Sequence, residues 1–156
     1  MKLSTKGRYG LRAMFALAKS YGKGPLPLGE VAMQEAISEA YLEQLVLTLR
    51  RTGLVRSVRG AQGGYELAKA PEEITVGDII RALDGPMAPS VCVMNEKEGG
   101  AKCARSGGCV TQIVWEKIRD GLNEVLDGIT LQSMLDDEKR LGAFNTQEKP
   151  YKGCVK

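Results

Sequence analysis

Apolar residues recur at helical spacing in the segments 4–21, 25–36 and 37–53, and turn residues separate these segments. Ser4 or Thr5 can cap the first segment and Ser38 the third, while Gly22 and Gly53 are placed to end them. The pattern therefore predicts three successive helices. The positions that carry the spacing are Leu11, Met14, Phe15 and Ala18, then Val31, then Tyr41, Leu42, Leu45 and Leu49.

Two short alternating runs, Leu54–Val58 and Tyr65–Ala68, follow the third helix and flank a glycine-rich turn at 60–64. This arrangement predicts a β-hairpin. Only Ala36 and Ile37 separate the second and third helices, which is typical of a helix-turn-helix pair. The predicted fold is thus mainly α with a small β-hairpin wing: a winged helix-turn-helix domain.

The second half of the chain predicts a short helix over Val76–Leu83, a break from Gly85 to Pro89, and a long amphipathic helix from Gly108 to Ile129. An apolar face of that length needs a partner, and a symmetric homodimer supplies one. We therefore expect a DNA-binding domain over 1–84, a cysteine-rich loop over 85–109, a dimerisation helix region over 110–140 and a flexible tail over 141–156. The apolar stripe consists of Val110, Ile113, Val114, Ile118, Leu122, Val125 and Ile129.

The charge is divided between the two halves of the chain. Residues 1–70 contain 11 Lys and Arg against 5 Asp and Glu, a net charge of +6, whereas residues 71–156 contain 11 against 14, a net charge of −3. A basic N-terminal half favours a polyanionic partner, and with the predicted fold that partner is double-stranded DNA. The alternative is a solvated charged face beside a purely structural hairpin.

The first turn of the third helix is the predicted DNA-reading element, because a recognition helix presents its N-terminal residues to base edges in the major groove. A glutamate there can accept a hydrogen bond from cytosine although it repels phosphates. An arginine at the wing tip can enter a minor groove, and other cations can neutralise phosphates. The candidates are Ser38, Glu39, Ala40, Tyr41 and Glu43 in the helix, Arg59 in the wing, and Lys6, Arg12, Arg50, Arg51 and Arg56 for phosphates.

Three of the four cysteines, Cys92, Cys103 and Cys109, lie in one glycine-rich loop of a chain without histidine. A polar N-terminus and the lack of a long apolar run predict a cytoplasmic protein with no membrane span, and structural disulfides are uncommon in that compartment. The spacings match neither a zinc knuckle nor the usual ferredoxin runs. A metal or cluster site, redox-reactive thiols and no role at all stay open on the spacing alone.

Catalysis is not expected. Without histidine there is no general base of that type and no cysteine–histidine or serine–histidine pair. The run "GAQGGY" lies in the predicted hairpin and does not open a helix, so it is not a nucleotide-binding loop.

The segments "MKLSTKGRYGLRAMFALA", "SEAYLEQLVLTLRRTGLVRSVRGAQGGYELAK" and "ITVGDIIRALDG", followed by a three-cysteine loop and a long helix with Trp115, resemble the iron–sulfur cluster regulator (IscR-type) family of transcription factors. The resemblance covers nearly the whole chain. It implies a homodimer of winged helix-turn-helix domains joined through the long C-terminal helix. It also implies a 2Fe–2S cluster held by Cys92, Cys103 and Cys109, through which the protein senses iron–sulfur or redox status.

The chain departs from the family pattern around the cluster ligands. The insertion "NEKEGGAK" lengthens the gap between the first two cysteines, and Gln112 replaces the histidine that is the fourth ligand in the best-known members. Cys154, an acidic residue such as Glu96 or Glu98, or a residue of a partner subunit are the candidates for that position. The competing functions are a cluster-free repressor that senses thiols or zinc, and an iron–sulfur carrier or electron-transfer protein.

Overall fold

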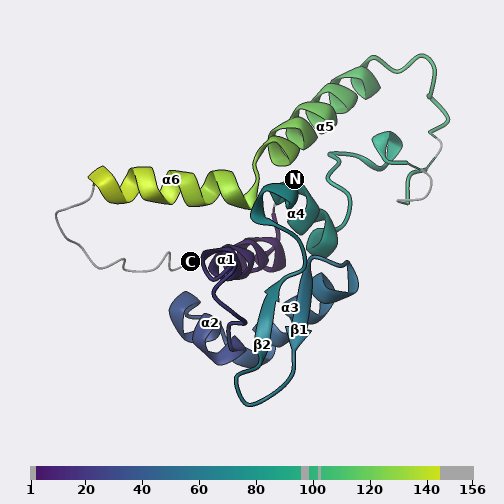
Figure 1. Ribbon diagram of the computed structural model, residues 1–156. Coiled ribbons are helices and arrows are strands. Elements are labelled where there is room, and N and C mark those ends of the chain that lie inside the picture. Colours follow the sequence, from purple (N-terminus) through teal and green to yellow (C-terminus); the bar gives the residue numbers. More distant parts are fainter. Residues whose placement is uncertain (1–2, 96–98, 102, 145–156) are drawn as a thin grey trace.

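The structure, a computed structural model, describes residues 3–95, 99–101 and 103–144. Helices α1–α4 and a two-stranded hairpin form one body, from which helices α5 and α6 project in different directions (Figure 1). The fold class predicted from the sequence is confirmed.

Helix α1, Thr5–Lys19, lies at the centre of this body and begins at the predicted cap. The Ser4 hydroxyl accepts a hydrogen bond from the Gly7 N–H at 3.3 Å, which satisfies one of the free donors of the first turn. A Cβ at Gly10 would lie 2.0 Å from Cδ1 of Leu83, so this glycine allows α1 and α4 to pack at close range. The amphipathic pattern predicted the helix correctly.

Helices α2, Leu28–Glu35, and α3, Glu39–Arg51, form the helix-turn-helix pair. The turn between them begins at Ala36, the one non-glycine residue with a positive φ (52°) in the part of the chain that the structure describes. The Ile37 N–H then donates to the Ala32 carbonyl at 3.0 Å, and the Ile37 side chain is buried. The left-handed residue and the buried isoleucine fix the turn.

Strands β1, Val55–Val58, and β2, Gly64–Leu67, pair antiparallel and form the predicted wing. Leu26 extends this sheet by one residue, because its N–H and C=O exchange hydrogen bonds of 2.9 Å with Tyr65. A Cβ at Gly64 would lie 2.5 Å from the Leu26 carbonyl oxygen, so the position requires glycine. The wing is therefore anchored to the segment that precedes α2.

Helix α4, Val76–Asp84, follows a 3-10 turn at Pro71–Glu73 and begins with a capping box. The Asp78 N–H donates to the Thr75 hydroxyl, and the Thr75 N–H donates to the Asp78 carboxylate, both at 3.0 Å. The cysteine loop follows α4 and contains a second 3-10 turn, Val91–Val93.

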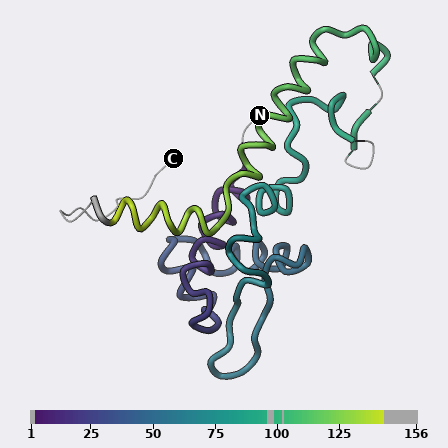
Figure 2. The backbone as a smooth tube through the Cα atoms, turned by 45° about the horizontal axis from the view of Figure 1, so that its top comes forward, coloured from purple at the N-terminus to yellow at the C-terminus, as the bar shows by residue number. Residues whose placement is uncertain are grey.

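The long amphipathic helix predicted over Gly108–Ile129 is α5, Val110–Gly128, and a further helix, α6 at Leu131–Phe144, follows it. The break between them is held by a β-bridge of Thr130 to Thr75, in which the Val76 N–H donates to the Ile129 carbonyl at 2.8 Å. The pattern analysis did not predict α6 as a separate helix. Figure 2 shows α6 turning away from α5 to run beside the N-terminal body.

One apolar core joins α1, α3, the hairpin and the start of α6. Leu131 is fully buried in it, and Met134 and Leu135 pack against it. Each such buried side chain contributes about 1.5–3 kcal/mol. The largest fully buried side chains are Met14, Val31, Leu42, Val46, Leu49, Val55, Leu67, Ile74, Ile79, Ile80 and Leu131.

Candidate functional site

The first turn of α3 presents a continuous exposed surface. Ser38 is the N-cap, and its hydroxyl accepts a hydrogen bond from the Tyr41 N–H at 3.3 Å. Glu39, Ala40 and Glu43 are exposed beside it. Exposure is a requirement for the predicted role of this turn, since side chains that read base edges must reach the major groove.

Tyr41 differs from its neighbours because it is half-buried. Its ring meets the ring of Tyr9 edge-on, with centroids 6.1 Å apart and an interplanar angle of 86°. Tyr41 therefore joins α3 to α1 in addition to any contact it makes with DNA.

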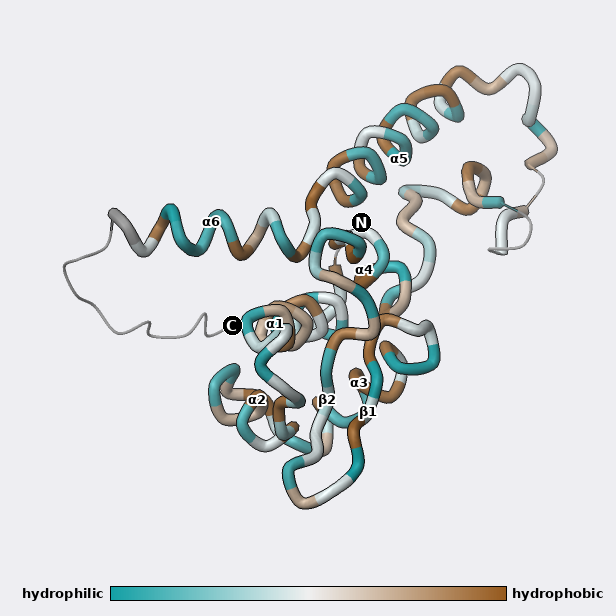
Figure 3. The backbone as a smooth tube through the Cα atoms, in the orientation of Figure 1, coloured by the Kyte–Doolittle hydropathy of each residue, from teal (hydrophilic) through white to brown (hydrophobic). Residues whose placement is uncertain are grey.

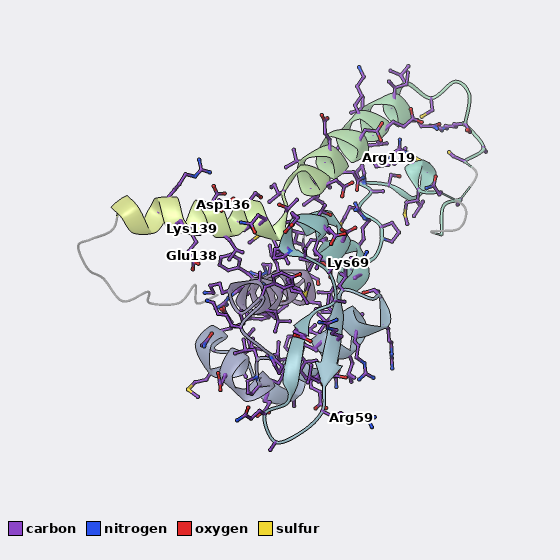
Figure 4. The ribbon with its side chains drawn as sticks, in the orientation of Figure 1. Arg59, Lys69, Arg119, Asp136, Glu138 and Lys139 are labelled. Atoms are coloured by element: carbon purple, nitrogen blue, oxygen red, sulfur yellow. The ribbon has the colours of Figure 1, made fainter. Side chains whose placement is uncertain are left out.

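Arg59 lies at the tip of the wing, immediately after β1, and its side chain is exposed (Figure 4). The turn behind it is closed by a hydrogen bond of 3.0 Å from the Gly63 N–H to the Gly60 carbonyl. Arg56, further down the hairpin, donates to Glu66 on β2 at 2.8 Å. Arg59 is thus the cation that extends furthest from the body on the wing.

Three further cations flank α3. Arg50 and Arg51 are exposed in its last turn, and Arg50 also donates to the Ser57 hydroxyl of β1 at 3.4 Å. Lys6 on α1 lines a surface hollow together with Arg51 and the outer face of α3. These positions place positive charge along α3 and at its C-terminal end, where it can meet phosphates.

Arg12 makes different contacts. Its Nε donates to a carboxylate oxygen of Glu35 at 2.8 Å, and its Nη2 donates to the Glu35 carbonyl at 2.8 Å. The sequence analysis assigned Arg12 to phosphates and gave Glu35 no role, because a contact across 23 residues leaves no trace in a local pattern.

The three cysteines of the loop have different surroundings. Cys92 is half-buried in the 3-10 turn, with its Sγ 3.3 Å from the Ser90 hydroxyl, whereas Cys103 is exposed. Cys109 is the N-cap of α5, and its Sγ lies 3.0 Å from the Thr111 hydroxyl. This hydrogen bond, together with the N–H of Gln112, lowers the pKa of the Cys109 thiol from its ordinary value.

The donor chemistry of this loop suits a soft metal or cluster, since it offers three thiols. The geometry is less favourable: across residues 3–95, 99–101 and 103–144, no three cysteine or acidic side chains converge on a position for one metal ion. Gln112, at the family's histidine position, donates to Glu116 at 3.1 Å. The other candidates for a fourth ligand, Glu96, Glu98 and Cys154, lie outside the described residues. The described part of the loop does not form a complete ligand set.

Two side chains of α5 attach the first part of the loop to the helix. Arg119, labelled in Figure 4, donates to the Val93 carbonyl at 2.7 Å, and Asn123 donates to the Met87 carbonyl at 3.3 Å. Asn123 also accepts from Arg81 of α4 at 3.2 Å. The neighbouring Asp127 carboxylate raises the pKa of Arg81 above its ordinary value. The sequence analysis missed this network, in which the loop, α4 and α5 share polar contacts.

The predicted apolar stripe of α5 is exposed along most of its length. Figure 3 shows hydrophobic positions recurring along this helix. Val110 is 76% exposed, Val125 60% and Ile113 53%, values that are unusual for aliphatic residues on a helix of this length. Only Leu126 of α5 is buried among the described residues. The face is suited to packing against another helix.

A helix-turn-helix pair with an exposed first turn, a hairpin tipped by an arginine and cations on both sides defines a winged helix DNA-binding protein. Residues 3–137 match the Rrf2 family, described as iron-dependent transcriptional regulators, and the chain belongs to this family. The resemblance found in the sequence is thereby confirmed. The chain is a DNA-binding transcription regulator.

The relatives carry names of the same kind. The chain is 48% identical over 134 residues to the HTH-type transcriptional regulator CymR of Bacillus subtilis. The matched residues cover 86% of this chain and 89% of the relative. It is 38% identical over 148 residues to the HTH-type transcriptional regulator IscR of Sodalis glossinidius, and the matched residues cover 95% of this chain and 87% of that relative. These names are those of regulators and not of enzymes, in agreement with the prediction that the chain is no enzyme.

Solved structures give the same result. The fold resembles CymR, the global cysteine regulator of B. subtilis, with a TM-score of 0.72 and 46% identity over 86% of this chain and 95% of that one. It also resembles T. potens IscR, with a TM-score of 0.73 and 44% identity over 97% and 95%. Across the described ranges, no helix has the length and apolar character that crossing a bilayer requires.

Proposed function

We propose that this regulator is a cytoplasmic homodimer whose binding to promoter DNA is set by a 2Fe–2S cluster held by Cys92, Cys103 and Cys109. In this proposal residues 1–84 bind DNA, 85–109 form the sensor and 110–140 carry the dimer contact. The flexible tail predicted over 141–156 does not begin at 141, because α6 continues to Phe144, and residues 145–156 lie outside the described residues. The direct DNA contacts are Ser38, Glu39, Ala40, Tyr41 and Glu43 in the major groove, Arg59 in the minor groove, and Lys6, Arg50 and Arg51 on phosphates.

The exposed apolar face of α5 supports the dimer. An amphipathic helix of 19 residues with such a face is stabilised when a second copy covers it, and a twofold dimer makes the two faces self-complementary. Two recognition helices related by this symmetry would read the two halves of a palindromic site.

The single observation that carries the sensor proposal is the position of the cysteine loop. The loop begins at α4, where Asp84 accepts a hydrogen bond of 3.0 Å from the Ser4 N–H of α1. It ends at Cys109, the N-cap of α5. A change in the loop therefore acts on a segment attached both to the DNA-binding body and to the dimer helix.

Among the described residues, Cys92, Cys103 and Cys109 do not surround one metal ion, so we expect the loop to rearrange when they bind a cluster. The glycines at 99, 100, 107 and 108 permit such rearrangement. A bound cluster would supply a centre that can be lost or change oxidation state. If the loop with the cluster and the loop without it favour different positions of α4 and α5, the two forms bind DNA with different affinity.

Iron and sulfide analysis of protein purified without oxygen tests the sensor proposal. We expect two iron and two sulfide ions per chain with visible absorption, and loss of both in Cys92→Ser, Cys103→Ser or Cys109→Ser. Ser106→Ala in the same loop is the matched control and should retain the cluster. Colourless protein with zinc, or with thiols that form a disulfide in air, would instead support the cluster-free alternative.

The carrier alternative is tested by DNA binding. Arg59→Ala should weaken binding to a promoter duplex if the chain is a regulator, and it should have no effect on an iron–sulfur carrier. The family assignment already favours the regulator.

A further inference from the structure

The guanidinium of Arg12 reaches from α1 to the last residue of α2. It donates one hydrogen bond to the Glu35 carboxylate and one to the Glu35 main-chain carbonyl, both at 2.8 Å. The same guanidinium lies over the ring of Tyr9, 5.6 Å from its centroid. Two of the five N–H donors of the guanidinium are thus occupied within the protein, which leaves fewer of them to contact a phosphate.

These contacts fall at the turn of the helix-turn-helix pair. The carbonyls in the last turn of a helix lack partners within the helix and carry partial negative charge, and a carboxylate beside them adds to it. Arg12 satisfies one such carbonyl and neutralises the carboxylate, directly before the left-handed Ala36. The Glu35 side chain is only 16% exposed, against 43% for Arg12, so water would replace the arginine poorly.

A second contact reaches the other side of the same turn. Tyr9, beneath the Arg12 guanidinium, meets Tyr41 edge-on in the first turn of α3. The Tyr41 N–H is in turn bonded to Ser38, the cap of α3. Arg12 and Tyr9 therefore connect α1 to both helices that flank the turn.

We propose that Arg12 is a positioning residue for sequence recognition. It holds the turn between α2 and α3 so that the first turn of α3 meets base edges at a fixed angle, and it is not a phosphate ligand. Phosphate contacts raise affinity for every sequence, whereas the position of base contacts decides specificity. Loss of Arg12 therefore lowers discrimination between sequences more than it lowers overall affinity.

The test compares two probes by fluorescence anisotropy between about 50 and 200 mM salt. One duplex is selected from a random pool by the wild-type protein, and the other is a random duplex of equal length. Arg12→Lys keeps the positive charge and the aliphatic stem but lacks the fork. We expect it to lose about tenfold in affinity for the selected duplex, the scale of one disturbed base contact, with unchanged binding to the random duplex.

The dependence of affinity on salt separates this role from a phosphate contact. A residue that neutralises one phosphate contributes about 0.9 to the slope of log K against log salt. Arg12→Ala should leave that slope unchanged if the residue positions the turn. Lys6→Ala, which removes an exposed cation from the same helix, is the reference for the loss of charge alone.

For Glu35→Gln, a simple charge effect and the proposal predict opposite changes in affinity for the selected duplex. Removal of a negative charge near DNA raises affinity for both duplexes if charge alone matters, whereas the proposal predicts weaker binding to the selected duplex. The double variant Arg12→Lys/Glu35→Gln should lose no more than the larger single loss, because both changes break one contact. Far-UV circular dichroism tests whether each variant is folded. If an Arg12 variant is unfolded, the binding of the two duplexes by Glu35→Gln tests the positioning role.

Wild-type behaviour of Arg12→Lys on the selected duplex would overturn the proposal. So would tighter binding of that duplex by Glu35→Gln, or an equal loss on both duplexes with a smaller slope in Arg12→Ala.

Discussion

Replacement of Asp84 by alanine should destabilise the DNA-binding body, because this residue joins the start of α1 to the end of α4. Its carboxylate accepts the Ser4 N–H at 3.0 Å and also the Ser4 hydroxyl. Both residues are half-buried, so water compensates only in part for the lost acceptor. The carboxylate also lies at the N-terminus of α1, where the helix dipole favours negative charge.

The expected cost follows from these contacts. A hydrogen bond to a charged group contributes about 1.5–3 kcal/mol in a protein, and a carboxylate at a helix N-terminus adds about 0.3–1 kcal/mol. Allowing for partial solvation, we expect Asp84→Ala to lower the free energy of unfolding by about 2 kcal/mol. For a chain of this size that corresponds to a fall in Tm of about 4–8 °C.

Urea unfolding followed by circular dichroism measures this effect, at one fixed chain concentration because a dimer gains stability with concentration. Asp137→Ala is the matched control: Asp137 makes an exposed ion pair with Arg140 one turn away on α6, and its loss should cost less than about 0.5 kcal/mol. Equal stability of the two variants would refute the reasoning.

Three further results are expected. Arg59→Ala should lower the slope of log K against log salt by about 0.9, whereas Lys69→Ala, just beyond β2, should leave it unchanged. Anisotropy titrations measure these slopes, and equal slopes for Arg59→Ala and the wild type would count against a wing contact. Ile118→Glu on the exposed face of α5 should convert the dimer to monomers in sedimentation velocity, and an unchanged dimer would exclude this face. The Thr111 hydrogen bond lowers the Cys109 pKa, so alkylation of Cys109 should begin at lower pH in the wild type than in Thr111→Val, and coincident pH profiles would contradict that cause.

Local pattern was sufficient for the helices of the DNA-binding body. Ser4 and Ser38 were identified as candidate caps from residue type and position alone, and both accept an N–H of the first turn. The hairpin followed from two alternating runs around glycines. These features are determined within a few residues, so a single sequence contains them.

Features that depend on distant contacts were not predicted. Helix α6 was not recognised as a separate helix, because its position is set by the bridge between Thr130 and Thr75, 55 residues apart in the chain, and by packing of its first turns on the N-terminal core. The sequence showed Arg12 as one more cation near the DNA-binding helix, and only the fold shows its partner Glu35. The arrangement of the cysteines is also undetermined by spacing, because glycines connect them.

Affinity for the selected duplex, measured on anaerobic protein before and after iron is removed, tests the central claim most directly. The account predicts that the two forms differ in affinity for the selected duplex by about fivefold or more, while their affinities for a random duplex stay alike. Identical titration curves for the two forms would contradict it.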